Sequence, residues 1–282
     1  AEKFFESEYR LDYKMHRYSK PIISILDGIV MGGGAGLMFA SSYKIATERT
    51  RFAMPEIGVG LFPDVGFTSV IKALPDGLGL YMMLTATQLS AKDTIFCNLT
   101  DASIKSEDIN YLLSEITENI WLDEFQENID LIGYLVKQNF YADKVKDLPD
   151  SKIEKELDEI QALTNEQELE KVCSNILSNH NDDDWYVRGR NSLKKGSPSS
   201  AHLIWHQCLN SAKLDLKEVF KFELNLAIQV TRIGDFKEGI RALIIDKDNS
   251  PKWRYDSIES VPIDWIKKHT DPAWQQNPLE DL

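Results

Sequence analysis

The chain has 282 residues, of which 43% are hydrophobic and 27% charged, so it has the composition of a globular protein with room for a large core. Its net charge of −13 offers no basic face to nucleic acid, although a small phosphorylated ligand needs only a local basic patch. No apolar run reaches the length of a membrane span, so we expect a soluble protein. The three cysteines form no CxxC pair, which indicates a reducing compartment and neither a zinc site nor a disulfide framework.

The first part of the chain alternates between helical and strand patterns. Residues 2–19 carry apolar side chains at helical spacing and stop before a proline. The isoleucine-rich residues 21–28 predict a short buried strand, and residues 29–42 predict a glycine-rich turn that leads into an apolar helix. Two further short strands are predicted at residues 43–47 and 51–54.

Glycine and proline residues predict a loop at residues 58–67. Helices are predicted at 67–74 and 77–86, and a shorter helix begins after Ser90 as its N-cap. Strands that alternate with helices in this way predict an α/β unit. Beyond about residue 105 the pattern changes to long, charged amphipathic helices, notably in residues 107–121, 150–179 and 214–233. We therefore predict an α/β core over residues 1–105 and a mostly helical portion over residues 106–282.

The glycine-rich turn contains Gly32, Gly33, Gly34 and Gly36. Its spacing matches neither the GxGxxG of dinucleotide sites nor the GxxxxGK[ST] of a P-loop. A ligand can approach the backbone N–H groups of such a turn closely, so one of them could stabilise a carbonyl oxygen as part of an oxyanion hole. Tight packing of the helix on the strand explains the glycines equally well.

Two carboxylates, Glu56 and Asp64, each follow a proline on a loop rich in apolar residues. A carboxyl among apolar neighbours tends to have a raised pKa, which makes it a candidate acid or base. The structural alternatives are that Asp64 caps the helix beginning near Gly66 and that Glu56 pairs with Arg51. For Asp64, the residues alone favour the cap.

The chain resembles the crotonase superfamily in two long runs, KPIISILDGIVMGGGAGL (residues 20–37) and YKIATERTRFAMPEIGVGLFPDVG (residues 43–66). It resembles one branch of that superfamily, the 3-hydroxyisobutyryl-CoA hydrolases, in GSPSSAH (196–202) and EGIRALIIDKDNSPKW (238–253). The similarity extends from Phe4 to Trp253 and is weaker between about residues 105 and 190. It implies a crotonase-like α/β spiral core with a helical C-terminal portion covering the active site.

The resemblance also implies roles for particular residues. Gly33, the second glycine of the triplet, would donate its N–H to the thioester oxygen. Glu56 and Asp64 correspond to the active-site Glu and Asp of the hydrolases, and Glu8 to a substrate-binding Glu in the motif FFxxEY. The hydratases of the superfamily carry a second catalytic Glu where this chain has Gly36. Because water addition across a double bond uses a pair of carboxylates, Gly36 disfavours a hydratase.

The activity implied by the resemblance is hydrolysis of 3-hydroxyisobutyryl-CoA in valine breakdown. Coenzyme A is then part of the substrate, and no cofactor or metal is expected. In the family, a second oxyanion N–H comes from a CAGGD-like loop ahead of the first helix, and these 282 residues contain no such loop. The resemblance thus implies a core that is incomplete at its N-terminus. Two alternatives stay open: a hydratase or isomerase, and a non-catalytic binding or assembly subunit.

Other candidate sites have weaker support. His202 and His206 have helical metal-ligand spacing but no third ligand nearby, and the run of aspartates at residues 182–184 reads as a solvated loop. The densest basic cluster could meet the phosphates of coenzyme A or be plain solvated surface; it consists of Arg188, Arg190, Lys194 and Lys195.

The expected partners are an acyl-CoA substrate, no nucleic acid and no membrane, and the resemblance allows a homo-oligomer. The family works in mitochondria in eukaryotes and in the cytoplasm in bacteria. The acidic composition and the C-terminal sequence WQQNPLEDL favour the bacterial cytoplasm, with the mitochondrial matrix as the alternative.

Overall fold

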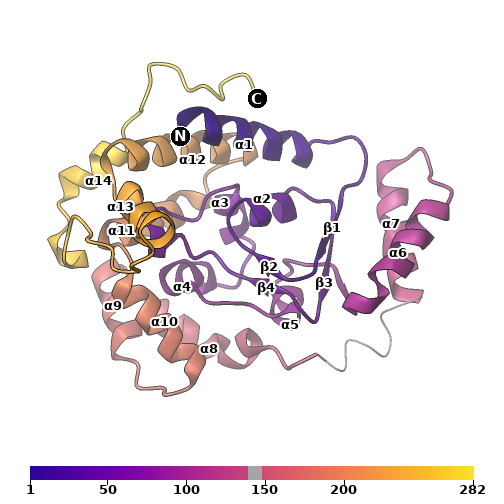
Figure 1. Cartoon of the computed structure of the whole chain (residues 1–282), viewed down its shortest axis with the longest axis horizontal. Helices are drawn as coiled ribbons and strands as arrows, with labels where there is room; N and C mark the ends of the chain where they lie inside the picture. Colours follow the sequence, from indigo (N-terminus) through magenta and orange to yellow (C-terminus); the bar gives the residue numbers. More distant parts are fainter. Residues whose placement is uncertain (139–147) are drawn as a thin grey trace. The chain divides into compact units, whose positions relative to one another are not determined.

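The computed structural model describes residues 1–138 and 148–282 (Figure 1). The chain forms two compact units that are interleaved along the sequence. The first unit comprises Ala1–Tyr13, Ala53–Thr87 and Leu157–Leu282. The second comprises the described residues of Lys14–Phe52 and Gln88–Glu156, so the predicted boundary near residue 105 falls inside it.

The second unit contains a parallel sheet whose strand order is β1 (Ile23–Leu26), β3 (Tyr43–Thr47) and β5 (Ala102–Ile104). A second parallel pair joins β2 (Ile29–Val30) to β4 (Arg51–Phe52). Parallel neighbours need crossover connections, and here helices lie in those connections. The helices that lie wholly in the described part of this unit are α2 (Gly33–Phe39), α5 (Ala91–Phe96), η2 (Ser106–Asp108), α6 (Ile109–Glu118) and α7 (Phe125–Val136).

The core of the second unit forms where the sheet meets α6 and α7. Ile45 and Ile104 of the sheet are buried with Leu112 of α6 and Ile132 and Val136 of α7. Branched apolar side chains suit such a covered, pleated surface. Residues on both sides of position 105 therefore share one core.

The first unit is mostly helical. Its α4 (Leu78–Thr85) is buried at every position, as the continuous apolar sequence LGLYMML requires, and it packs against α10 and α11. The other segments with residues in this unit are α1 (Glu2–His16), η1 (Glu56–Val59), α3 (Phe67–Ile71), α8 (Lys152–Thr164), α9 (Leu169–Ser178), α10 (Asp184–Lys195), α11 (Pro198–Ser211), α12 (Leu216–Ile233), α13 (Phe236–Ile240), the π-helix η5 (Arg241–Ile245), η6 (Ile258–Ser260) and α14 (Ile263–Thr270).

Most predicted elements are present, with shifted ends. The predicted strand at 43–47 coincides with β3, and Ser90 caps α5 through a capping box with Asp93. The helical run 150–179 is two helices, because its apolar stripe is interrupted after Leu163 and resumes out of phase at Leu169. Across residues 1–138 and 148–282, no helix is both long and apolar enough to cross a bilayer.

Candidate active site

Asp64 lies in the turn between η1 and α3, and its side chain is 4% exposed. The hydroxyl of Tyr9, on α1, donates a hydrogen bond to Asp64 Oδ2 over 2.5 Å. Tyr9 is fully buried, and burial together with the neighbouring Asp64 charge raises its pKa well above the usual value. Tyr9 therefore stays protonated and acts as the donor in this pair.

The turn that carries Asp64 has an unusual backbone. Val65 adopts a left-handed conformation with a φ of 52°, followed by Gly66 with a φ of 87°. A β-branched residue in this region is strained by roughly 1–3 kcal/mol and persists only where its surroundings hold it. The expectation that Asp64 caps the following helix is not met, since its side chain is bonded to Tyr9 and α3 has Gly66 as its N-cap.

The carboxylate of Glu223, on α12, holds this turn. It accepts hydrogen bonds from the N–H of Gly66 (2.7 Å) and from the N–H and hydroxyl of Thr68 (3.0 and 2.7 Å). Gln207 of α11 adds bonds from its amide to the Pro63 carbonyl (2.5 Å) and the Thr68 hydroxyl (2.7 Å). Two helices distant in sequence thus hold both ends of the turn.

Glu56 is the first residue of η1, is 5% exposed, and has an Oε2 atom without a hydrogen-bond partner among the described residues. Its sequence neighbours Met54, Ile57 and Phe62 are buried as well. Burial, and then the nearby Asp64 charge, raises the pKa of Glu56 well above its usual value. A buried carboxyl oxygen without a partner is unfavourable in a folded protein, so Glu56 Oε2 is suited to meet a ligand or water.

The backbone of η1 rests directly on α13. A Cβ atom at Gly239 would lie 2.0 Å from the carbonyl oxygen of Val59, so no larger residue fits this contact. Asp235, at the start of α13, accepts hydrogen bonds from the Ser197 and Ser199 hydroxyls and from the Arg254 N–H.

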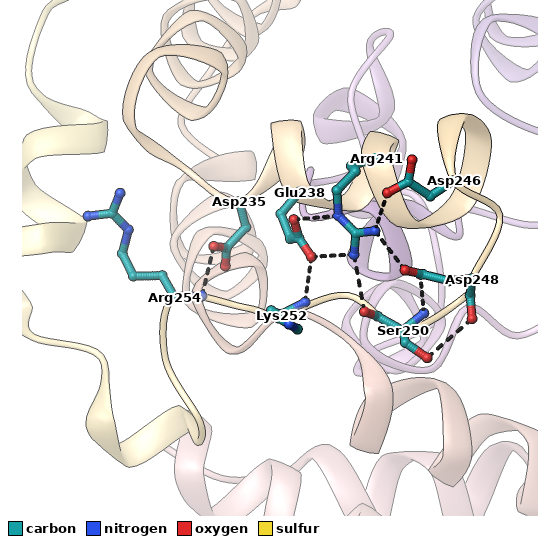
Figure 2. Close-up of polar contacts among 8 residues, drawn as sticks. All are labelled: Asp235, Glu238, Arg241, Asp246, Asp248, Ser250, Lys252 and Arg254. Carbon is teal, nitrogen blue, oxygen red and sulfur yellow. Dashed lines mark hydrogen bonds and ion pairs between the residues drawn. The ribbon is translucent and has the colours of Figure 1, made fainter.

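The segment after α13 is held by an arginine network that Figure 2 shows. The Arg241 guanidinium bonds to Glu238 through two nitrogens (2.8 and 2.9 Å), and to Asp246 (2.6 Å) and Asp248 (2.7 Å). Glu238 in turn accepts the N–H of Lys252 over 2.7 Å. These contacts lie within the stretch EGIRALIIDKDNSPKW. They support the backbone of α13, which in turn contacts η1, the element that carries Glu56.

Glu8 and Asp12 occupy successive turns of α1 on the side of Asp64. Burial raises the pKa of the half-buried Glu8. Asp12 is 2% exposed, with an Oδ2 that has no hydrogen-bond partner in the described part of the chain. Burial, then the charges of Glu8 and Asp64, raises the pKa of Asp12 to about 7.

Glu8, Asp12, Glu56 and Asp64 thus form one carboxyl cluster. Burial raises the pKa of Asp64 to about 7; the Tyr9 hydrogen bond opposes this shift and the Glu8 charge adds to it. Carboxyls that exchange protons near neutrality can act as general acids and bases.

Of the residues predicted for the site, the structure brings Glu8, Glu56 and Asp64 together in the first unit. Gly33 lies in the second unit, at the start of α2. Its N–H has no backbone hydrogen-bond partner among the described residues, whereas those of Gly34 and Ala35 bond to the preceding turn. Gly33 is therefore available as a donor, and its convergence with the carboxyl cluster stays a prediction.

Sequence reasoning missed Tyr9, Asp12 and Glu223. A signal existed for Glu223, because it lies on the apolar stripe of α12 between Phe220 and Ala227, where a charged residue needs a specific partner. Asp12 follows Glu8 by one helical turn, which places both on one face of α1. Tyr9 is the last residue of the FFxxEY motif, but that motif was interpreted only for Glu8.

The other candidates have structural contacts of their own. His202 Nε2 lies 2.9 Å from the Ile258 carbonyl oxygen, and His206 stacks on Phe222. Within the described ranges no cluster of three or more His, Cys, Asp or Glu side chains is arranged to hold a metal ion. The four basic residues of the predicted phosphate cluster all lie on α10, and a phosphate-binding role for them stays a prediction.

Comparison with known proteins gives consistent matches. The model of a family described as "Enoyl-CoA hydratase/isomerase" matches residues 1–270. The mitochondrial 3-hydroxyisobutyryl-CoA hydrolase of Danio rerio is 31% identical over 270 residues, which cover 95% of this chain and 68% of that protein. The 3-hydroxyisobutyryl-CoA hydrolase 1 of Arabidopsis thaliana is 30% identical over 287 residues, covering 98% of this chain and 72% of that protein.

Two solved structures are similar over nearly the whole chain. A carnitinyl-CoA dehydratase from Mycobacterium thermoresistibile has a TM-score of 0.84 and 25% identity, covering 100% of this chain and 77% of its own. An enoyl-CoA hydratase from Rhodobacter sphaeroides has a TM-score of 0.81 and 26% identity, and the match covers 96% of this chain and 74% of that one.

Proposed function

Because this chain belongs to the enoyl-CoA hydratase/isomerase family, we propose that it hydrolyses an acyl-CoA thioester, with 3-hydroxyisobutyryl-CoA as its substrate. The expected crotonase-like α/β fold is confirmed by the family match and by the two similar structures. The observation that carries the proposal is the buried Glu56, with an unpartnered Oε2, beside an Asp64 that Tyr9 holds. The names of the curated relatives supply the substrate.

In the proposed reaction, ionised Glu56 takes a proton from water while the water oxygen bonds to the thioester carbonyl carbon. The tetrahedral intermediate then breaks its carbon–sulfur bond, and the proton passes to the departing CoA thiolate. In the alternative route, Glu56 itself attacks the carbonyl carbon and water hydrolyses the resulting anhydride. Both routes release one carboxylic acid and one thiol.

The remaining site residues would bind the substrate. The Gly33 N–H would stabilise the developing negative charge on the carbonyl oxygen. Asp64 and Glu8 would accept a hydrogen bond from the 3-hydroxyl group or orient the water. A carboxylate close to a hydroxyl-bearing acyl group favours that substrate over an unsubstituted one, because an unpaired buried acceptor is costly.

An enoyl-CoA hydratase is the second candidate, favoured by the name of one similar structure. Gly36 opposes it, since the second carboxylate expected of a hydratase is absent from that position. The two activities also differ in their requirement for a leaving group, because only hydrolysis breaks the carbon–sulfur bond.

The test measures thiol release from 3-hydroxyisobutyryl-CoA and, in parallel, the loss of crotonyl-CoA absorbance. We expect steady release of free CoA and hydration at least 100-fold slower, about 3 kcal/mol in transition-state stabilisation. Efficient hydration without thiol release would replace the hydrolase by the hydratase. Binding of the acyl-CoA with neither reaction would support the non-catalytic binding subunit.

The compartment and the assembly state stay predictions. The vertebrate relatives are named as mitochondrial, in line with the matrix alternative, while the bacterial cytoplasm remains our first expectation. A homo-oligomer is compatible with the family.

A further inference from the structure

We propose that Tyr9 is a positioning residue for Asp64: its hydroxyl holds Oδ2 in place and leaves Oδ1 to meet the substrate. This inference rests on the proposed function, in which Asp64 binds the substrate hydroxyl or orients water. Tyr9 itself touches no reacting atom in this scheme.

The geometry of the pair is tightly constrained. The Tyr9 ring packs between Phe5 and Phe220, with ring centroids 5.9 and 5.8 Å away. The 2.5 Å separation between the Tyr9 hydroxyl and Asp64 Oδ2 is typical of a hydroxyl that donates to an ionised carboxylate. Because the ring is wedged in the core and the Asp64 turn is held by Glu223, neither partner can drift from this contact.

The charges around Asp64 explain why a neutral donor is needed there. Among the described residues, the titratable groups that interact with Asp64 are Tyr9 and the carboxyls of Glu8 and Asp12 on α1, Glu56 on η1 and Glu223 on α12. Burial and the Glu8 charge oppose ionisation of Asp64, whereas the Tyr9 hydrogen bond lowers the Asp64 pKa. Tyr9 thereby orients Asp64 and favours its ionised form.

The test compares Tyr9→Phe with Tyr13→Phe. Both changes remove one hydroxyl and keep a ring that packs on Phe220, although Tyr9 is buried and Tyr13 half-buried. For Tyr9→Phe we expect the Asp64 pKa to rise by about one unit, so that kcat/KM falls about tenfold at pH values below the acid limb, to which both Glu56 and Asp64 contribute. We expect Tyr13→Phe to follow the wild-type profile.

The outcomes separate this inference from the proposed function. An unchanged acid limb in Tyr9→Phe, or an equal shift in both variants, would overturn the positioning role of Tyr9. The hydrolase proposal would still stand if the wild type releases thiol. If the wild type releases no thiol, the function fails, and a carboxyl-carbon NMR titration of Asp64 decides the role of Tyr9. A higher Asp64 pKa in Tyr9→Phe than in Tyr13→Phe would support the positioning role of Tyr9, and equal Asp64 pKa values would refute it.

Discussion

At the residue scale, Glu56 and Asp64 are both buried, but the fold provides them with different partners. Asp64 receives the Tyr9 hydroxyl, whereas Glu56 Oε2 has no partner among the described residues. Desolvation raises the pKa of each carboxyl, and in Asp64 the hydrogen bond counteracts part of the shift. Glu56 is therefore the stronger base once ionised, and Asp64 the better-oriented acceptor.

Replacing Glu56 by Gln should reduce kcat by about 10²–10⁴-fold, because the amide has the same shape but cannot accept a proton. Thermal melting of the same preparation should show no loss of stability, since Gln keeps the shape of Glu56 and burial disfavours the ionised carboxyl that it replaces. Glu218→Gln, an exposed change on α12, serves as the activity control. A loss of only a few-fold in the Glu56 variant would assign Glu56 to binding rather than to chemistry.

Asp12 gives a prediction on stability. Since its pKa in the folded protein is raised to about 7, its contribution to stability is complete below its usual pKa of 3.8 and is lost as the pH rises through 7. Asp12→Asn, which stays neutral, should match the wild type at low pH and exceed it at pH 8 by on the order of 1–3 kcal/mol.

This difference should appear as a melting temperature several degrees higher for Asp12→Asn at pH 8, together with a flatter pH dependence. The exposed Asp182→Asn controls for a general charge effect in this acidic chain. A variant that is less stable than the wild type at pH 8 would show that Asp12 is stabilised in its ionised form.

At the element scale, the position of η1 depends on a backbone-to-backbone contact with α13. Gly239 meets the Val59 carbonyl, and a Cβ at Gly60 would lie 2.7 Å from the Asp235 backbone. Because these neighbours are main-chain atoms, no rotamer change can relieve a clash. The stretch from Asp235 to Arg254 therefore helps to fix the position of η1 and of Glu56, and it also includes a run that resembles the 3-hydroxyisobutyryl-CoA hydrolases.

Gly239→Ala should destabilise the protein by about 2–4 kcal/mol and also reduce kcat, because η1 must move away from α13 and takes Glu56 with it. Gly58→Ala is the matched control: it lies on η1 itself, and a Cβ there meets no atom within 4 Å. Urea unfolding and thiol release measured on both variants test this. Equal effects of the two changes would contradict the claimed contact.

At the scale of the whole molecule, the chain passes between its two units several times. The first unit takes its residues from three separate stretches, and the second from two. A single cut near residue 105 would divide both cores. It would separate β5 from α6 and α7, and α3 and α4 from the helices that cover them.

Fragments 1–105 and 106–282, each expressed alone, should consequently lack a cooperative unfolding transition and show little amide-exchange protection. Mixing the two fragments should restore part of the protection, because each supplies the other's missing core residues. Cooperative unfolding of fragment 1–105 by itself would instead establish the predicted boundary as a true domain border.

The amino-acid sequence was enough to predict the local elements and the chemical candidates. Apolar periodicity identified the segments that became β3 and α12, and Ser90 was recognisable as a cap, because these features depend on neighbouring residues. Glu56 and Asp64 stood out as carboxylates among apolar residues, and the resemblance added Glu8 and Gly33.

The contacts that hold these candidates depend on long-range packing. Tyr9 reaches Asp64 across 55 positions of sequence, and Glu223 reaches Gly66 across 157. Such pairs come from the packing of whole helices, and neither residue's local pattern names its partner. The residues alone favoured a helix cap by Asp64, but in the structure the Asp64 side chain bonds to Tyr9, and Glu223 accepts the N–H groups of Gly66 and Thr68. A carboxylate on a distant helix can do so only because the fold brings that helix to the start of α3.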